Sequence, residues 1–175
     1  MPEVETVLDF GCGSGLWLNL LNLRKKNIKQ LYGVDIDKRK LGQFCSIKSE
    51  KITLLTPELH QIPPNSFDCI TILDVFYLIS SQERIQWLKV FHHLLKPKGT
   101  LIIKDVFIGN NWKTWVIFIQ EFLAVKIFKI TSGKLHWFSK NTLLSELTLN
   151  NFKKIEVINM ASYYPYPHFL CLAKK

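Results

Sequence analysis

Short apolar runs alternate with longer amphipathic stretches along the chain. Seven runs rich in β-branched and aromatic residues predict strands: Thr6–Phe10, Gln30–Val34, Ile52–Leu55, Phe67–Leu73, Thr100–Asp105, Lys153–Ile158 and His168–Ala173. Helices are expected between them, including one after Ser80, because Ser80 and Glu83 have capping-box spacing. Strands that alternate with helices indicate βαβ units and a mainly parallel sheet. Only the short loop Asn159–Pro167 joins the last two runs, so these are expected to pair antiparallel.

The predicted fold is therefore α/β, a doubly wound seven-stranded sheet with five parallel strands plus a C-terminal antiparallel hairpin. With 175 residues, 47% hydrophobic and 21% charged, the chain suits a single domain over residues 1–175 and excludes a disordered one. The four cysteines form no C-x-x-C pair, and no His/Cys cluster has metal spacing, so we expect no metal. No signal peptide follows Met1, which predicts a cytoplasmic protein with reduced thiols.

A glycine-rich turn follows the first predicted strand. The segment Val7–Gly15 has the spacing G-x-G-x-G, with Asp9 two residues before the first glycine. Glycines let a ligand approach the backbone closely, and the N-terminus of the following helix offers free N–H groups. A carboxylate at this point disfavours a pyrophosphate and favours a cationic, amine-bearing ligand. Asp35, at the end of the second run, can accept both hydroxyls of a ribose.

These segments resemble the class I S-adenosylmethionine-dependent methyltransferases (methyltransferase type 11/12-like) over nearly the whole chain. Val7–Gly15 is similar to their first motif, and Tyr32–Asp37 to their second-strand acid motif. Ile62–Ile70 is similar to the segment that enters their fourth strand, and Leu94–Leu101 to their turn before strand five. The resemblance implies a Rossmann-like fold, S-adenosyl-L-methionine as cofactor and methyl transfer as the reaction.

The family's cofactor-binding roles transfer to nine positions of this sequence: Asp9, Gly11, Cys12, Gly13, Asp35, Ile36, Glu58, Leu59 and Leu73. The two glycines would pack against the methionine part, and Asp9 would order the loop. Asp35 would hold the ribose hydroxyls, while Ile36 would lie beside the adenine. Glu58 and Leu59 would lie near the adenine amino group, and Leu73 beside the methionine group.

Three residues are candidates for catalysis. Asp74 and Asp105 end two predicted strands, and His168 begins the antiparallel last strand, which places it at the carboxyl edge where ligands bind. Methyl transfer depends mainly on alignment, so a fixed catalytic pair is not required. A lone histidine is more often structural, and that alternative stays open for His168.

The acceptor is expected to be a small molecule, hydrophobic or lipid-like. Trp112–Ile130 has 13 apolar residues among 19, interrupted by lysines. It is either a helix packed on the sheet or part of a lid, residues 106–150, over an apolar acceptor pocket. The net charge is +9, and residues 111–175 carry 9 basic and 3 acidic side chains, which favours peripheral contact with an anionic membrane. With only three arginines among 23 basic residues, nucleic acid is expected to be an unlikely partner.

The first predicted strand begins at Thr6, so the N-terminal helices usual in this family would be lacking. A truncated reading frame, an open site or a partner chain would each account for this. The alternative function is accordingly a non-catalytic or partner-dependent subunit of the same fold, of unknown oligomeric state. A nicotinamide-binding oxidoreductase is a weaker alternative, because Leu16 interrupts the G-x-G-x-x-G fingerprint.

Overall fold

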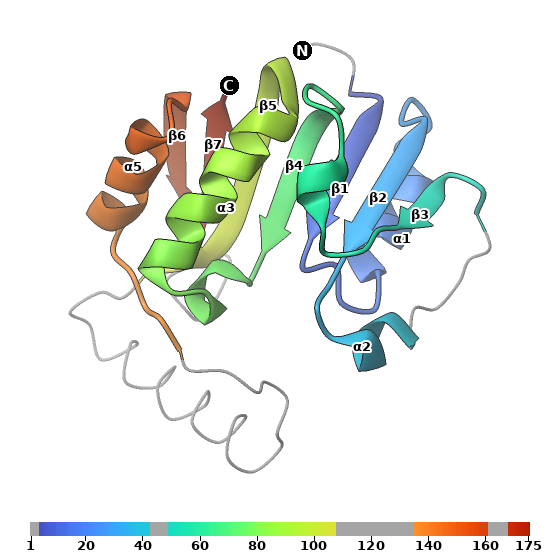
Figure 1. Ribbon diagram of the computed structural model, residues 1–175, viewed down its shortest axis with the longest axis horizontal. Coiled ribbons are helices and arrows are strands. Elements are labelled where there is room, and N and C mark those ends of the chain that lie inside the picture. The colour runs from blue at the N-terminus through green and yellow to red at the C-terminus, as the bar shows by residue number, and fades with distance from the viewer. Residues whose placement is uncertain (1–3, 43–48, 108–134, 161–167) are drawn as a thin grey trace.

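All seven predicted strands are present in the computed structural model, and they form one sheet (Figure 1). The structure describes residues 4–42, 49–107, 135–160 and 168–175. The strands are β1 (Thr6–Phe10), β2 (Gln30–Val34), β3 (Ile52–Leu54), β4 (Phe67–Leu73), β5 (Leu95–Val106), β6 (Lys153–Asn159) and β7 (His168–Lys174). Their order across the sheet is β3-β2-β1-β4-β5-β7-β6.

The directions of the strands agree with the sequence pattern. β1 to β5 pair in parallel, whereas β7 pairs antiparallel with both β5 and β6. The predicted α/β fold, with five parallel strands and a C-terminal antiparallel hairpin, is confirmed. Because β7 runs opposite to both neighbours, β6 runs in the same direction as the first five strands.

Helices cover both faces of the sheet. They are α1 (Leu16–Arg24), α2 (Lys38–Gly42), α3 (Ser81–Leu94) and α5 (Lys140–Leu149), with the 3-10 turns η1 (Leu59–Gln61) and η2 (Phe76–Leu78). Figure 1 shows α3 and α5 in front of the sheet and α1 behind it. The capping box of α3 forms as expected: the Ser80 hydroxyl accepts from the Glu83 amide, and the Glu83 carboxylate accepts from the Ser80 amide.

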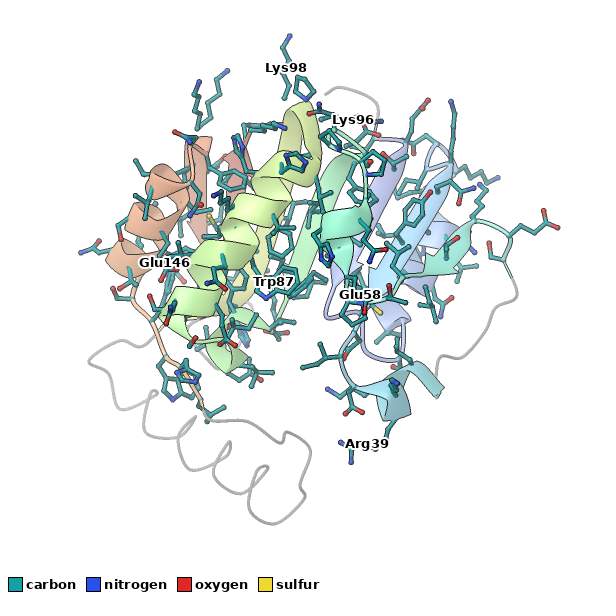
Figure 2. All side chains as sticks on the ribbon, in the orientation of Figure 1. Arg39, Glu58, Trp87, Lys96, Lys98 and Glu146 are labelled. Carbon is teal, nitrogen blue, oxygen red and sulfur yellow. The ribbon has the colours of Figure 1, made fainter. Side chains whose placement is uncertain are left out.

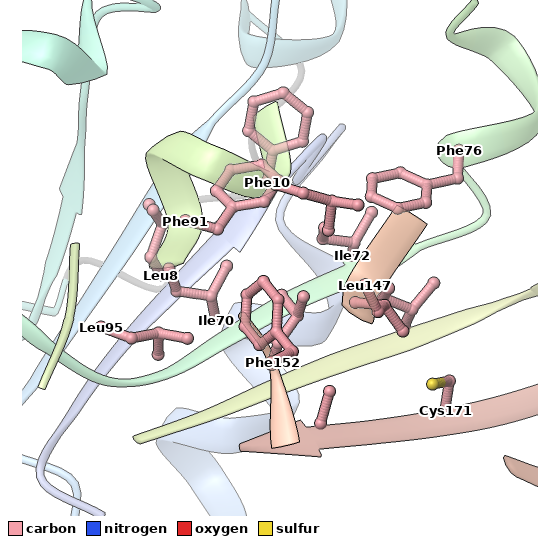
Figure 3. Packing of buried hydrophobic residues seen from close by; sticks show 14 of the residues in the cluster. Leu8, Phe10, Ile70, Ile72, Phe76, Phe91, Leu95, Leu147, Phe152 and Cys171 are labelled. Carbon is pink, nitrogen blue, oxygen red and sulfur yellow. The ribbon is translucent and has the colours of Figure 1, made fainter. Parts of the chain in front are cut away.

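The larger core lies between the sheet and α3 with α5 (Figure 3). Alternate residues of each strand point to opposite faces, so Leu8 belongs to this core and Val7 to the smaller cluster under α1. Phe91 of α3 and Leu147 of α5 reach the larger core. Two buried clusters on opposite faces account for the near-continuous apolar character of the strands.

The parallel register brings three loops together at one edge. Phe10, the last residue of β1, pairs with Val34 of β2 on one side and Ile72 of β4 on the other. The loops after these three strands therefore share the carboxyl edge of the sheet, where ligands bind in open α/β folds.

β5 differs most from its predicted bounds, whereas β3, β6 and β7 each differ by one residue at their C-terminal ends. β5 begins at Leu95 rather than Thr100, directly after the last residue of α3. Its first residues include the turn Pro97-Lys98-Gly99, and the pairing with β4 shifts register between Phe67 and Cys69. The sequence pattern did not predict the start of β5 at Leu95, because Pro97 and Gly99 follow it and both residue types disfavour regular strands.

Within the described ranges, no helix is both long and apolar enough to cross a membrane. Of the predicted lid, residues 106–150, the segment 108–134 lies outside the described residues, and Trp112–Ile130 lies within that segment.

Candidate functional site

The glycine loop after β1 adopts the conformation that its sequence predicts. Gly11, Gly13 and Gly15 have φ values of 79°, 54° and 75°, in the left-handed region that favours glycine. The amides of Gly11 and Cys12 donate to the Val34 carbonyl at 2.8 and 3.0 Å, which ties the loop to the end of β2. A Cβ on Gly11 would lie 2.4 Å from a methyl of Val75, whereas one on Gly13 would meet no atom within 4 Å.

A cleft of about 730 Å³ opens beside this loop, at the carboxyl edge of the sheet. It is lined by the ends of β1 and β2, by the loops after β1, β2, β3 and β4, and by α2 and α3: Phe10, Gly11, Val34, Asp35, Ile36, Asp37, Lys38, Arg39, Lys40, Pro57, Asp74, Val75, Leu78, Ile79, Glu83 and Trp87. This volume is in the range of small-molecule and cofactor sites.

Asp35 connects the glycine loop to the loop after β2. Its Oδ2 accepts from the Gly13 amide and its Oδ1 from the Asp37 amide, both at 2.8 Å. A carboxylate offers about four lone-pair sites, so Asp35 can still accept two ribose hydroxyls. Ile36 follows it with 84% of its surface exposed, and an apolar side chain so placed at a cleft is suited to the face of a base.

Asp9 and Cys12 lie behind the cleft lining. The buried Asp9 carboxylate accepts from the Thr71 hydroxyl at 2.7 Å, and burial raises its pKa to about 6. Burial, with the nearby charges of Asp9 and Asp35, raises the pKa of the Cys12 thiol to about 12, so this thiol stays protonated. Direct contact of either side chain with a cofactor stays a prediction.

The predicted adenine-side pair lies next to a residue that lines the cleft. Pro57 is part of the lining, whereas the next residue, Glu58, is exposed and precedes η1. Leu59 is 1% exposed and belongs to the larger core, so its side chain faces away from solvent. Leu73, at the end of β4, is half-buried. The cofactor roles of Glu58, Leu59 and Leu73 stay predictions.

Two of the three candidate catalytic residues come together at the end of β4. Asp74 lines the cleft, has a φ of 56° and pairs with Lys104, whose Nζ lies 2.5 Å from Oδ2. The other carboxylate oxygen lies 3.9 Å from Nδ1 of His168, the first residue of β7. Burial, and then the charge of Lys104, lower the pKa of His168, while Asp74 acts in the opposite direction.

Asp105, the third candidate catalytic residue, is fully buried. Its carboxylate accepts from the amides of Phe76, Tyr77 and Val106 at 2.9, 3.3 and 2.7 Å. Burial raises its pKa to about 7, while the three N–H donors favour the ionised form. In this position Asp105 fixes the η2 turn beside the cleft, and its part in catalysis stays a prediction.

Sequence reasoning missed the wall of the cleft that α3 contributes. Trp87 lines the cleft and packs on Phe10 and Phe91, with ring centroids 4.7 and 5.8 Å away. Trp87 and Phe91 are four residues apart, which is the spacing of one helical face, and such spacing does not distinguish a cleft residue from a core residue. Among the described residues, no group of three or more His, Cys, Asp or Glu could hold a metal.

The cleft fits the cofactor that the sequence resemblance implies. The open space at Gly13 lets a ligand approach where other residues carry a Cβ. Ile36 offers an apolar surface, and Asp35 offers acceptors for a ribose. Asp35 and Asp74 give the cleft carboxylates that suit the sulfonium and ammonium charges of S-adenosylmethionine.

Comparison with known proteins defines the class. Residues 2–157 match the methyltransferase domain family, and the chain belongs to that family. It is 25% identical over 173 residues to a tRNA U34 carboxymethyltransferase of Pseudoalteromonas translucida (strain TAC 125), covering 92% of this chain and 50% of that protein. It is 32% identical over 114 residues to the tRNA U34 carboxymethyltransferase of Helicobacter pylori (strain ATCC 700392 / 26695), covering 61% of this chain and 42% of that protein.

A solved structure shows the same fold. The phosphoethanolamine N-methyltransferase 2 of Haemonchus contortus, solved with S-adenosyl-L-methionine, has a TM-score of 0.74 at 15% identity, covering 100% of this chain and 49% of that one. The expected class, a class I S-adenosylmethionine-dependent methyltransferase, is confirmed, and with it S-adenosylmethionine as the cofactor. The chain spans half or less of the two curated relatives described above.

One expectation about partners is wrong. The low arginine content led us to expect that nucleic acid is an unlikely partner, yet both relatives are tRNA-modifying enzymes by name. The reasoning failed because phosphate contacts do not require arginine forks. Lysine binds phosphate as a point charge, so a lysine-rich chain can bind RNA.

Proposed function

We propose that this chain binds S-adenosylmethionine in the cleft and transfers its methyl group to a nucleoside of tRNA. The similarity to a tRNA U34 carboxymethyltransferase carries the choice of acceptor, because it extends over 92% of the chain. The net charge of +9 supports an anionic macromolecule as substrate.

Both acidic and basic residues line the cleft, and their distribution suits such a substrate. The carboxylates of Asp35 and Asp74 are among its lining residues, and so are the successive basic residues Lys38, Arg39 and Lys40 of α2. Arg39 is held in place by a bidentate pair with Asp37, with Nε and Nη2 at 3.1 and 3.0 Å. Acids can thus contact the cationic cofactor, while bases on α2 can contact the phosphates that flank the target nucleoside.

The residues of the chain mainly orient the reactants. When bound, the cofactor supplies an electrophilic carbon on a sulfonium, which is already a good leaving group. Asp35, Ile36 and the glycine loop would hold the nucleoside and the amino acid parts of the cofactor. Asp74 and His168 would lie beside the acceptor, where a neutral imidazole can take up a proton and the carboxylate 3.9 Å from Nδ1 stabilises the imidazolium that forms.

A transfer assay tests this proposal. The purified chain is incubated with S-adenosylmethionine labelled in the methyl group and with tRNA that lacks modifications, and the tRNA is then digested to nucleosides. Label in a nucleoside fraction is the expected result, and the mass of that nucleoside identifies the group transferred. Asp35→Ala should abolish transfer, whereas the exposed acid of β6, Glu156→Ala, should leave it unchanged.

Binding of the cofactor without any transfer to tRNA would contradict the proposed acceptor. Transfer that persists in Asp35→Ala would show that the cofactor is held elsewhere.

A further inference from the structure

Six lysines gather at the edge of the sheet opposite the cleft. This basic edge consists of Lys96, Lys98, Lys153, Lys154, Lys174 and Lys175. The topology brings them together because β5 and β6 begin at this edge and β7 ends there. Figure 2 shows Lys96 and Lys98 at one end of the molecule and Arg39, beside the cleft, at the other.

Contacts fix the positions of Lys96, Lys174 and Lys175, and within the described part of the chain Lys96 is the one of the six lysines that pairs with a carboxylate. Lys96 pairs with Asp68 at 3.0 Å. Lys174 Nζ donates to the Thr100 hydroxyl at 2.6 Å, and Lys175 Nζ donates to the Leu95 carbonyl at 2.6 Å and the Asn65 side-chain carbonyl at 2.9 Å. The oxygens around Lys174 and Lys175 belong to neutral groups, which hold an ammonium in place without cancelling its charge.

The lysines also repel one another across the sheet. Lys153 of β6 lies directly opposite Lys174 of β7 in the antiparallel register. Like charges in this position destabilise a strand pair. Lys153 and Lys175 also contribute, after burial, to lowering the pKa of His92 at the end of α3, which agrees with a positive field at this edge. Folding therefore gains nothing from this concentration of charge, whereas a bound polyanion would offset the repulsion.

Backbone strain points in the same direction. Lys98 has a φ of 66° and Lys154 a φ of 47°, and both lie where the strand pairing shifts register. Glycine is the residue that such positions favour, and for other residues the left-handed conformation costs about 1 kcal/mol or more. Two lysines at such strained positions on one edge indicate that their charge contributes to function.

We propose that the basic edge binds the phosphate backbone of the RNA substrate at a second place, away from the target nucleoside. This inference rests on the proposed function, since it assigns tRNA to both sites. The seven residues of β4 separate the basic edge from the cleft by roughly 20 Å along the strand, so different parts of one RNA would contact them. Lysines make sequence-independent phosphate contacts, so the basic edge would position the tRNA while the cleft selects the nucleoside.

A double variant isolates the basic edge from the cleft. Lys98→Gly with Lys154→Gly removes two charges and relieves the two left-handed positions, so the variant should unfold at a temperature no lower than that of the wild type. The matched control, Lys26→Gln with Lys89→Gln, removes the same charge from two exposed lysines outside the basic edge. Each protein is titrated with tRNA by fluorescence anisotropy at several salt concentrations, and with S-adenosylhomocysteine in a calorimeter.

The basic-edge variant should bind tRNA more weakly than the control. The slope of log K against log salt should fall by about two, because two lysines no longer neutralise a phosphate each. Its affinity for S-adenosylhomocysteine should equal that of the wild type. Equal tRNA binding by the two variants would overturn the proposal that the basic edge binds RNA, while leaving the proposed function intact. If the wild type bound no tRNA but bound phosphatidylserine vesicles through these lysines, the assignment to RNA would be overturned in favour of a membrane surface.

Discussion

The buried ion pair between α3 and α5 gives a prediction that follows directly from the geometry. Arg84 and Glu146 are 2% and 5% exposed. The guanidinium donates from Nε to Oε2 at 3.0 Å and from Nη2 to Oε1 at 2.8 Å, and the Ser81 hydroxyl also donates to Oε1 at 2.8 Å. Glu146→Gln keeps the shape but puts an amide N–H₂ where a carboxylate oxygen accepted, and it leaves the guanidinium buried without a counter-charge.

The expected cost is about 3–5 kcal/mol in the free energy of unfolding, the range for a buried pair that loses one partner. The effect should extend to the cleft, because Arg84 also donates to the carbonyl of Ile79, a cleft residue, at 2.9 Å. The double variant Arg84→Met with Glu146→Leu removes both charges and should recover most of the loss, since apolar side chains of similar volume can replace a buried pair.

Urea unfolding followed by circular dichroism measures these differences, with an exposed ion pair as the control. Lys29 and Glu5 pair at 2.6 Å but are 68% and 36% exposed, so Glu5→Gln should cost less than about 1 kcal/mol. If Glu146→Gln costs no more than Glu5→Gln, the buried network does not stabilise the contact between α3 and α5, and the reasoning fails.

Three further predictions concern the cleft and the buried acid behind it. Ile36→Ser should leave stability unchanged, because Ile36 is 84% exposed, and should weaken S-adenosylhomocysteine binding about tenfold in calorimetry; unchanged binding would remove Ile36 from the site. Gly13→Ala should fold, at a cost of about 1 kcal/mol in the free energy of unfolding, and should lose cofactor binding. Gly11→Ala should unfold much more easily, because its Cβ would lie 2.4 Å from a methyl of Val75. Equal melting temperatures of the two variants would contradict this difference. Burial raises the pKa of Asp9 to about 6 in the folded state, so the folded protein holds a proton that the unfolded chain has released. Asp9 should therefore lower the free energy of unfolding by up to about 3 kcal/mol as pH rises from about 4 to about 6. Asp105, whose pKa burial raises to about 7, acts in the same direction, so Asp9→Asn should reduce the pH dependence in urea titrations without abolishing it.

The fold followed from local patterns because its elements are regular. Strand composition, the capping box at Ser80 and the short connection before His168 were enough to predict the parallel sheet and the final antiparallel pair. The glycine loop was also predictable. Gly11, Gly13 and Gly15 occupy the positions at which the backbone has a positive φ, a conformation that favours glycine, so the spacing of the glycines indicates the turn.

The partners of the buried acids could not be predicted, because they lie far away in the sequence. Asp9 accepts from Thr71, and Asp105 accepts from the amides of Phe76 and Tyr77, contacts that depend on strand register. A strand-end aspartate has the same pattern whether it faces a ligand or supports a turn. Only the structure separates the exposed Asp74 from the buried Asp105.

The concentration of lysines was hidden for the same reason. Its members come from three segments, residues 96–98, 153–154 and 174–175, which the order of β5, β7 and β6 brings together. Along the chain, four of these lysines contributed to a basic last third, which led us to expect a membrane surface rather than a polyanion, and nothing connected Lys96 and Lys98 with them.

A calorimetric titration of the folded chain with S-adenosylhomocysteine, with NAD as control, tests the central claim that the cleft is the cofactor site. We expect saturable binding at one site and no heat with NAD, with binding abolished in Asp35→Ala and kept in Glu156→Ala. No binding by a folded wild-type chain, or equal binding by Asp35→Ala, would contradict the account.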